Sequence, residues 1–233
     1  GWIAGPLTAG FVLFTTTSLR ALVETARDVI ETTETDPERA RERVPALVGR
    51  NPESLSPSEL RSGAVESAAE NLADGLIAPL LAFVVGTQLA AALGAGPSLA
   101  FGAAAAGWVK GVNTLDSMLG YRSKPVGWAG ARLDDLVMAV PARVAAVAIA
   151  LAAGRPGAVV AARRWAREPL SPNSGWPMAT LAVALDVGLV KPGVYDLRPE
   201  ARLPDRERGR RGVRVVAGAG VLSILASGVI AWL

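Results

Sequence analysis

Three long stretches of this chain contain no ionisable side chain, and polar segments separate them. The stretches cover residues 1–19, 75–109 and 215–233. Uncharged apolar runs of about 18 residues or more are typical of helices that cross a lipid bilayer. The sequence therefore predicts an all-α, multi-pass integral membrane bundle, with residues 1–233 forming a single membrane-embedded helical domain.

The polar segments carry signals that start helices. Asp36 and Pro37 are typical of an N-cap and a first helical position, and this helix is expected to end near residues 48–49. Residues 56–59, Ser-Pro-Ser-Glu, have the pattern of a capping box at the start of a second, amphipathic helix. Pro79 is expected to kink or end that second helix.

Further breaks divide the rest of the chain. Residues 80–109 are interrupted by Gly-Ala-Gly-Pro at 94–97, which favours a hairpin of two short helices. We expect residues 116–132 to be mostly loop. The other predicted elements are an apolar helix at 133–154, a turn-rich loop at 171–177, an apolar helix at 178–190 and a basic linker at 197–214 before the last span.

Composition narrows the chemistry. The chain has no Cys and no His, which excludes disulfides, thiolate metal sites and His-based acid–base catalysis. Any metal must be a hard cation bound by oxygens, most plausibly Mg²⁺. The net charge is +3, but the basic residues gather at 155–167 and 191–214 beside apolar segments. The positive-inside rule explains this better than nucleic-acid binding does, and it places these segments in the cytoplasm.

Three acids form a stripe on the second polar helix. Glu66, Glu70 and Asp74 recur at i, i+4 and i+8, opposite an apolar stripe. Like charges at this spacing destabilise an isolated helix by about 0.2–0.5 kcal/mol per pair. The alternative is that these three acids form a solvent-exposed face of the helix. However, no Lys or Arg occurs from residue 62 to 109 to balance the acids, which favours a bound cation.

A second polar cluster begins where the uncharged central stretch ends. Lys110, Asn113 and Asp116 share one helix face at i, i+3 and i+6. Lys110 alone could be a lysine that extends from a helix end to water, but neither Asn113 nor Asp116 favours membrane insertion. This combination suits nucleotide phosphates, with the ammonium on phosphate and the carboxylate on Mg²⁺.

Further polar residues flank the apolar segment 133–154. Asp134 and Asp135 near its start are explained equally well as acids that complement a helix dipole. Arg143 lies among Ala and Val, and an arginine in such a place usually has an acidic partner or an anionic ligand. Asp135, two turns earlier, is the candidate partner. A single active site also requires Asp116 and Asn173 on one side of the bilayer, so we expect either that this segment is buried or re-entrant or that the apolar helix at 178–190 compensates by packing inward.

Six blocks of this sequence, in order, resemble the adenosylcobinamide-phosphate synthases of cobalamin biosynthesis, called CbiB or CobD. The resemblance covers roughly residues 18–196. The blocks are Val48–Arg50; Ala64–Asn71 with Asp74, Gly75 and 78–80; Lys110–Met118 with Gly120 and Tyr121; Ala131–Asp135; Pro141–Arg143; and Ser171–Asn173. Asn51 departs from the family pattern, in which an Asp commonly follows Gly-Arg.

The resemblance implies a membrane enzyme that uses ATP and Mg²⁺. It implies an amide ligase of the EC 6.3.1 class, which joins adenosylcobyric acid to aminopropanol or its O-phosphate through an activated carboxylate, giving adenosylcobinamide or its phosphate. ATP places the site on the cytoplasmic face of the cell membrane. Partners are then these substrates and membrane lipid, with no nucleic acid; other cobalamin-assembly enzymes and a homo-oligomer are left open.

The resemblance also assigns roles to residues. The catalytic set is Glu66, Glu70, Lys110 and Asp116. The substrate- or phosphate-binding set is Asn71, Asn113, Tyr121, Arg132, Arg143, Ser171 and Asn173. The metal set is Asp74, Asp116, Asp134 and Asp135.

One family feature has no counterpart here. Members begin with a membrane segment that contains an Asp-rich, His-Pro stretch, and we expect this N-terminal family segment to be absent from the chain. Two alternatives to the ligase remain. One is a non-catalytic regulatory relative with the same fold, as in the distantly similar AmpE-type proteins, and the other is a transporter of corrinoids or cations.

Overall fold

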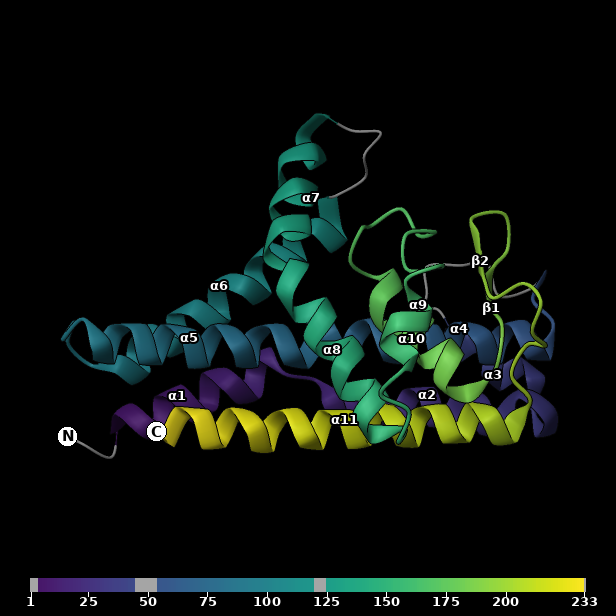
Figure 1. Ribbon diagram of the computed structural model, residues 1–233, viewed down its shortest axis with the longest axis horizontal. Coiled ribbons are helices and arrows are strands. Elements are labelled where there is room, and N and C mark those ends of the chain that lie inside the picture. Colours follow the sequence, from purple (N-terminus) through teal and green to yellow (C-terminus); the bar gives the residue numbers. More distant parts are fainter. Residues whose placement is uncertain (1–3, 45–53, 120–124, 233) are drawn as a thin grey trace.

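The computed structural model describes residues 4–44, 54–119 and 125–232 of the chain. Helices dominate these residues, and one small β-hairpin interrupts them (Figure 1). In chain order the elements are α1 (Ala4–Thr16), α2 (Leu19–Thr35), α3 (Pro37–Arg43), α4 (Pro57–Leu72), the π-helical turn η3 (Ala73–Ile77), α5 (Ala78–Ala92), α6 (Ser98–Leu119), α7 (Pro125–Val137), α8 (Ala139–Ala152), α9 (Ala158–Ala162), α10 (Gly175–Leu185), β1 (Leu189–Lys191), β2 (Tyr195–Leu197) and α11 (Arg206–Trp232).

Three helical stretches of the described chain are long and apolar enough to cross a membrane. They are Ala4–Thr35, Pro57–Ala92 and Arg206–Ala231. A fourth crossing exists if α7 and α8 form one span, although the two helices are bent by 48° at their junction. The protein is thus an all-α multi-pass membrane protein, as the uncharged runs predict. The expectation for residues 133–154 was a buried or re-entrant segment, and the bend fits either a broken span or a re-entrant loop.

The helix starts follow the sequence signals. The Asp36 carboxylate accepts a hydrogen bond from the Arg39 backbone N–H at 3.2 Å, with Pro37 at the first helical position. Ser56 and Glu59 form the reciprocal capping box. The first of these helices ends at Arg43, and its expected end near residues 48–49 lies outside the described residues.

A kink or an end was expected at Pro79, and the helix does not end there, because the chain is helical throughout Pro57–Ala92. The irregularity lies before the proline, where η3 makes a wider turn and the Ala78 N–H bonds the Ala73 carbonyl. Residues 116–132 are not mostly loop either, because α6 continues to Leu119 and α7 begins at Pro125. Pro125 stands at a helix start, where a missing N–H costs nothing.

The C-terminal third also differs from the prediction. The helix expected at residues 178–190 ends at Leu185, because Asp186 adopts a left-handed conformation with φ of 57°. An unpredicted antiparallel hairpin follows, in which Leu189 pairs with Leu197. The second half of the expected basic linker 197–214 is helical, since α11 begins at Arg206.

Interactions across the bundle stabilise the basic start of α11. The Asp205 carboxylate accepts a hydrogen bond from the Arg208 backbone N–H at 2.8 Å, as a helix cap does. Arg206 and Arg210 both donate hydrogen bonds to Glu31 of α2. This pairing explains why a strongly basic segment is ordered as helix.

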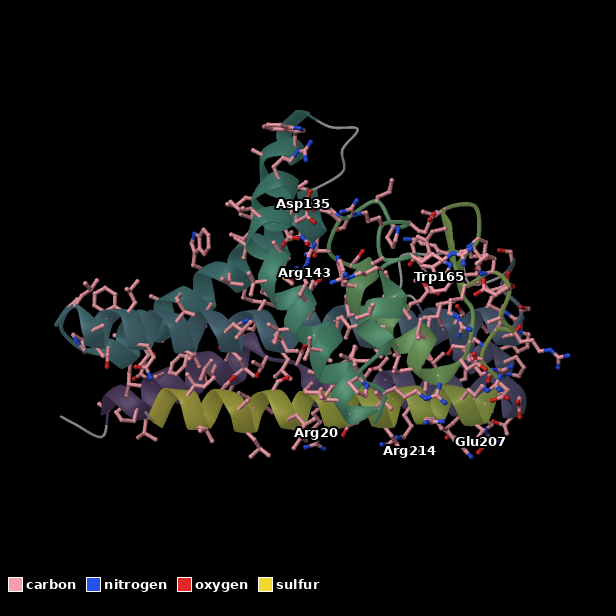
Figure 2. All side chains as sticks on the ribbon, viewed as in Figure 1. Arg20, Asp135, Arg143, Trp165, Glu207 and Arg214 are labelled. Carbon is pink, nitrogen blue, oxygen red and sulfur yellow. The ribbon has the colours of Figure 1, made fainter. Side chains whose placement is uncertain are left out.

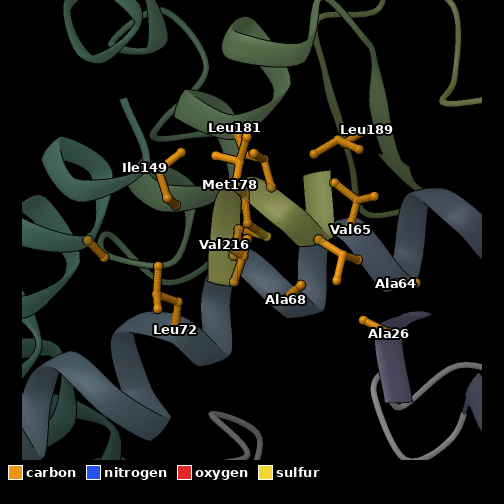
Figure 3. Packing of buried hydrophobic residues seen from close by; sticks show 14 of the residues in the cluster. Ala26, Ala64, Val65, Ala68, Leu72, Ile149, Met178, Leu181, Leu189 and Val216 are labelled. Carbon is orange, nitrogen blue, oxygen red and sulfur yellow. The ribbon is translucent and has the colours of Figure 1, made fainter. Parts of the chain in front are cut away.

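The core surrounds α4, which packs against α2, α10, α11 and β1. Figure 3 shows Val65, Ala68 and Leu72 of α4 facing Met178 and Leu181 of α10. These side chains are at most 1% exposed. The apolar stripe of the second polar helix is therefore a core stripe, as its spacing predicts.

The predicted hairpin of two apolar helices is confirmed by the packing of α5 on α6. Gly102 permits the close approach, since a Cβ added there would lie 2.1 Å from Oγ1 of Thr87 and 2.7 Å from the carbonyl oxygen of Phe83. The hairpin extends to one end of the molecule and returns, and α7 then rises away from the long helices (Figure 1). The polar end of α6 is thereby brought back beside the end of α4.

Candidate functional site

A polar cavity of about 140 Å³ lies where α4, η3, α6, α7, α8 and the turn before α10 meet. Acids from four places in the chain line it: Glu70, Asp74, Asp116 and Asp134. The other lining residues are Ala73, Asn113, Ser117, Met138, Ala142, Ser171, Asn173, Ser174 and Pro177. Among the described residues, no Lys or Arg belongs to this lining.

The acidic stripe reaches the cavity where α4 passes into the π-helical turn η3. Glu70 lies on the last turn of α4 and Asp74 lies within η3, and both line the cavity. Leu72 and Leu76 on the other side are at most 3% exposed and belong to the core. A π-turn shifts the following side chains relative to an ideal helix and is frequent at functional sites.

Helix α6 supplies an amide between two of the acids. The side chain of Asn113 is 8% exposed and lies close enough to Asp74 and Asp134 to interact with both carboxylates. Lys110, one turn earlier, does not line the cavity but interacts electrostatically with Asp74. The predicted shared face of α6 therefore exists, with its amide and acid in the cavity and its cation at the margin.

The two adjacent acids of α7 have different surroundings. Asp134 faces the cavity, and its buried Oδ1 has no hydrogen-bond partner in the described part of the chain. Asp135 instead holds the 171–174 turn: Ser171 Oγ donates to Asp135 Oδ1 at 3.4 Å, and Asn173 Nδ2 donates to its backbone carbonyl at 2.7 Å. Only Asp134 of the two lines the cavity.

Arg143 of α8 also binds the 171–174 turn. Its guanidinium donates hydrogen bonds to Oδ1 of Asn173 and to the carbonyl oxygen of Ala139, the latter at 2.8 Å. It also lies over the ring of Trp176, 5.1 Å from the centroid. Figure 2 shows Asp135 and Arg143 on either side of the bend between α7 and α8. Asp135 and Arg143 were expected to be partners, and they are linked through Asn173, which forms a hydrogen bond with each of them.

Several residues assigned a role from the sequence lie outside this cavity. Glu66 is 1% exposed and accepts hydrogen bonds from Ser62 Oγ and Tyr195 Oη, each at 2.7 Å. Asn71 turns back along its own helix, and its Nδ2 donates to the Ser67 carbonyl and hydroxyl. Their positions therefore do not support the assignment of Glu66 to catalysis or of Asn71 to substrate binding. Of α4 and η3, only Glu70, Ala73 and Asp74 line the cavity.

Arg132 and Tyr121 were also assigned to substrate or phosphate binding. Arg132 is exposed and lies over the Trp128 ring at 5.9 Å, outside the cavity lining. Tyr121 lies outside the described residues.

Some residues around the cavity have no signal in the sequence. Ser117 and Ser174 line it, and Met138 closes it at the bend between α7 and α8. Trp176 supports Arg143, and only its place in the turn-rich segment suggested interest. Tyr195 reaches Glu66 from a strand that the sequence did not predict.

The donor set suits a hard cation that is shared with a ligand. In the described part of the chain, no three carboxylates converge closely enough to form a complete metal site. Mg²⁺ is usually held by one or two protein carboxylates together with waters and phosphate oxygens. The buried, unpartnered Oδ1 of Asp134 is the type of atom such an ion binds. The residues therefore fit Mg²⁺ carried by a nucleotide better than a permanently bound metal.

Comparison with known proteins identifies the relatives of the chain. The family described as CobD/Cbib protein matches residues 2–216. A probable cobalamin biosynthesis protein CobD of Methanothrix thermoacetophila is 36% identical over 232 residues, covering 97% of this chain and 70% of the relative. The cobalamin biosynthesis protein CobD of Geobacter metallireducens is 40% identical over 207 residues, covering 82% of this chain and 60% of the relative.

A third relative agrees. The cobalamin biosynthesis protein CobD of Mycobacterium tuberculosis is 40% identical over 242 residues, covering 96% of this chain and 72% of the relative. No solved structure matches the chain.

Proposed function

Since this chain belongs to the CobD/CbiB family and takes part in cobalamin biosynthesis, we propose that it is an ATP-dependent amide ligase. Its substrates would be adenosylcobyric acid and aminopropanol or its O-phosphate, and its product adenosylcobinamide or its phosphate. The observation that carries this proposal is one cavity lined by four carboxylates and, among the described residues, by no cationic side chain.

The chemistry explains why an acidic cavity is useful. A carboxylate does not acylate an amine in water, so ATP must first convert it to a reactive acyl phosphate. The amine is protonated near neutral pH and cannot attack until the proton is removed. Glu70, Asp74, Asp116 and Asp134 would bind the ammonium group, and one of them would accept its proton.

The bond-forming step balances without a further reactant. The amine nitrogen forms a bond to the acyl carbon, and the bond from that carbon to the phosphate oxygen breaks. The nitrogen loses two protons in all: a cavity carboxylate accepts the first before the attack, and the inorganic phosphate, which leaves with the electron pair, takes up the second. Asn113 lies between Asp74 and Asp134 and would hold the two carboxylates in place.

Cationic groups lie around the cavity and not in its lining. Lys110 is near Asp74, and Arg143 is fixed beside the lining residue Asn173. Positive charge at these positions would attract phosphate to the rim while the amine occupies the acidic interior. Mg²⁺ held by Asp116 or Asp134 would supply further charge neutralisation at the nucleotide phosphates.

The proposed orientation places this cavity on the cytoplasmic side. ATP is cytoplasmic, and the basic residues at 155–167 and 191–214 follow the positive-inside rule for cytoplasmic segments. Both arguments support the same face of the membrane.

An activity assay tests the proposal directly. Purified protein in detergent is incubated with adenosylcobyric acid, Mg-ATP and aminopropanol phosphate, and the amide is detected by mass spectrometry. The proposal requires amide product whose formation depends on ATP, together with release of ADP and phosphate. Transport of the corrinoid in proteoliposomes without amide formation would support a transporter instead, and neither activity would support a regulatory relative.

A further inference from the structure

A second polar pocket, separate from the acidic cavity, lies between α2 and α11. Its volume is about 290 Å³, and it is lined by Arg27, Ile30, Glu31, Arg210, Val213 and Arg214. We propose that this pocket binds the phosphate of an anionic phospholipid headgroup at the membrane boundary.

The charge of the pocket is unbalanced. Three arginines face one carboxylate, Glu31, and that carboxylate is already engaged by Arg210 and by Arg206. In the described residues, neither Arg27 nor Arg214 forms an ion pair. Arg210 and Arg214 are also like charges at i, i+4, an arrangement that is unfavourable unless an anion is shared. The pocket therefore has positive charge available for a phosphate.

The position of the pocket along α11 favours a lipid as the source of that phosphate. The helix carries its arginines up to Arg214 and then has no ionisable residue over 215–232. At about 1.5 Å per residue this run is roughly 27 Å long, close to the thickness of a bilayer's hydrocarbon core. Arg214 therefore marks the level at which the lipid headgroups begin.

Helix α2 brings its arginine to the same level. Gly209 of α11 faces Ile30 and Gly220 faces Leu19, so the two helices run antiparallel side by side. Figure 2 shows Arg214 on the outer edge of the bundle along α11. Basic residues next to a span attract anionic lipids by about 1 kcal/mol each in general, and here two helices hold them around one pocket.

Thermal unfolding with added lipid tests the proposal. The protein is purified in a neutral detergent, and tryptophan fluorescence gives the unfolding midpoint with phosphatidylglycerol, with phosphatidylcholine or with inorganic phosphate. We expect phosphatidylglycerol to raise the midpoint by roughly 5 °C or more near saturation. Phosphatidylcholine and inorganic phosphate should produce little change.

Variants locate the effect. The double substitution Arg27→Gln with Arg214→Gln should remove at least half of the phosphatidylglycerol shift, whereas Arg27→Lys with Arg214→Lys should largely restore it. Arg163→Gln with Arg202→Gln alters two other exposed arginines and serves as the matched control. An equal shift in the first double variant and in wild type would overturn the proposal. So would an equal loss in the control pair, or a full shift with inorganic phosphate alone.

Discussion

Glu70 on α4 and Asp116 on α6 line the same cavity, although α5 and most of α6 separate them along the chain. The α5–α6 hairpin is the physical cause, because it leaves the end of α4 and returns the polar end of α6 beside it. The acids from two distant helices therefore form one site through apolar packing that contains no ionisable residue.

Removing the charge of the cavity acids should abolish ligation without unfolding the protein. We predict that Asp116→Asn and Asp134→Asn each lower the rate of amide formation by about 10²-fold or more, because each removes a carboxylate that binds the ammonium group, accepts its proton or holds Mg²⁺. Initial rates of product formation measure the effect. Glu168→Gln, at an exposed acid that does not line the cavity, is the control and should keep the wild-type rate. Wild-type rates in both cavity variants would remove these carboxylates from the chemistry.

The hairpin packing should be sensitive to a single methyl group. Gly102→Ala places a Cβ 2.1 Å from Thr87 Oγ1, so α5 and α6 must separate. We predict a loss of about 1–3 kcal/mol in the free energy of unfolding, the usual cost of overpacking. The measurement is chemical or thermal unfolding in detergent.

Gly107→Ala on the same helix is the matched control, because a Cβ there meets nothing within 4 Å. It should be neutral or slightly stabilising through helix propensity. Equal destabilisation by both substitutions would show that close packing at Gly102 is not the cause.

The sequence predicted the parts of this fold that depend on local signals. These parts are the caps at Asp36 and Ser56, the uncharged spans and the α5–α6 hairpin. Each depends on residues that are close together in the sequence. The acids Glu70, Asp74, Asp116 and Asp134 were also identified. Their convergence was an inference from chemistry and family resemblance, since no local pattern specifies which distant helices meet.

The failures have a common cause in tertiary contacts. Glu66 has the same spacing as Glu70 and Asp74, yet Ser62 and Tyr195 occupy its carboxylate. The basic segment before the last span reads as a linker, but Glu31 of α2 pairs with it and it forms helix. Ser62 is one turn away from Glu66 on the same helix, but Tyr195 and Glu31 lie far in the sequence from the residues that they contact, so local pattern alone could not predict either outcome.

Glu66 should matter for stability more than for catalysis. We predict that Tyr195→Phe lowers the free energy of unfolding by about 1–3 kcal/mol, because it removes a hydrogen bond to a buried carboxyl group. The ligation rate of the folded variant should stay close to that of wild type. A large loss of rate with unchanged stability would instead place Glu66 and Tyr195 in the reaction.

One ion pair gives a pH dependence of stability. Arg198, through a hydrogen bond and its charge, lowers the pKa of Asp186 below its ordinary value. A depressed folded pKa means that the stabilisation is present above the unfolded pKa, about 3.9, and is lost as pH falls below it. Asp186→Asn should therefore be less stable than wild type at pH 7, and the difference should shrink below about pH 4.

The asparagine variant is suitable because Asn tolerates the left-handed backbone found at residue 186. Unfolding midpoints of both proteins between pH 7 and pH 3 provide the comparison. A difference that stays constant over this range would show that the charge of Asp186 is not responsible.

The position of the bound amine shows whether the acidic cavity is the amine site. A structure determined by electron cryomicroscopy with aminopropanol phosphate bound would show where its nitrogen lies. We predict the nitrogen inside the acidic cavity, about 3 Å from a carboxylate oxygen of Asp116, Asp134, Asp74 or Glu70. An amine bound outside this cavity would overturn the proposal.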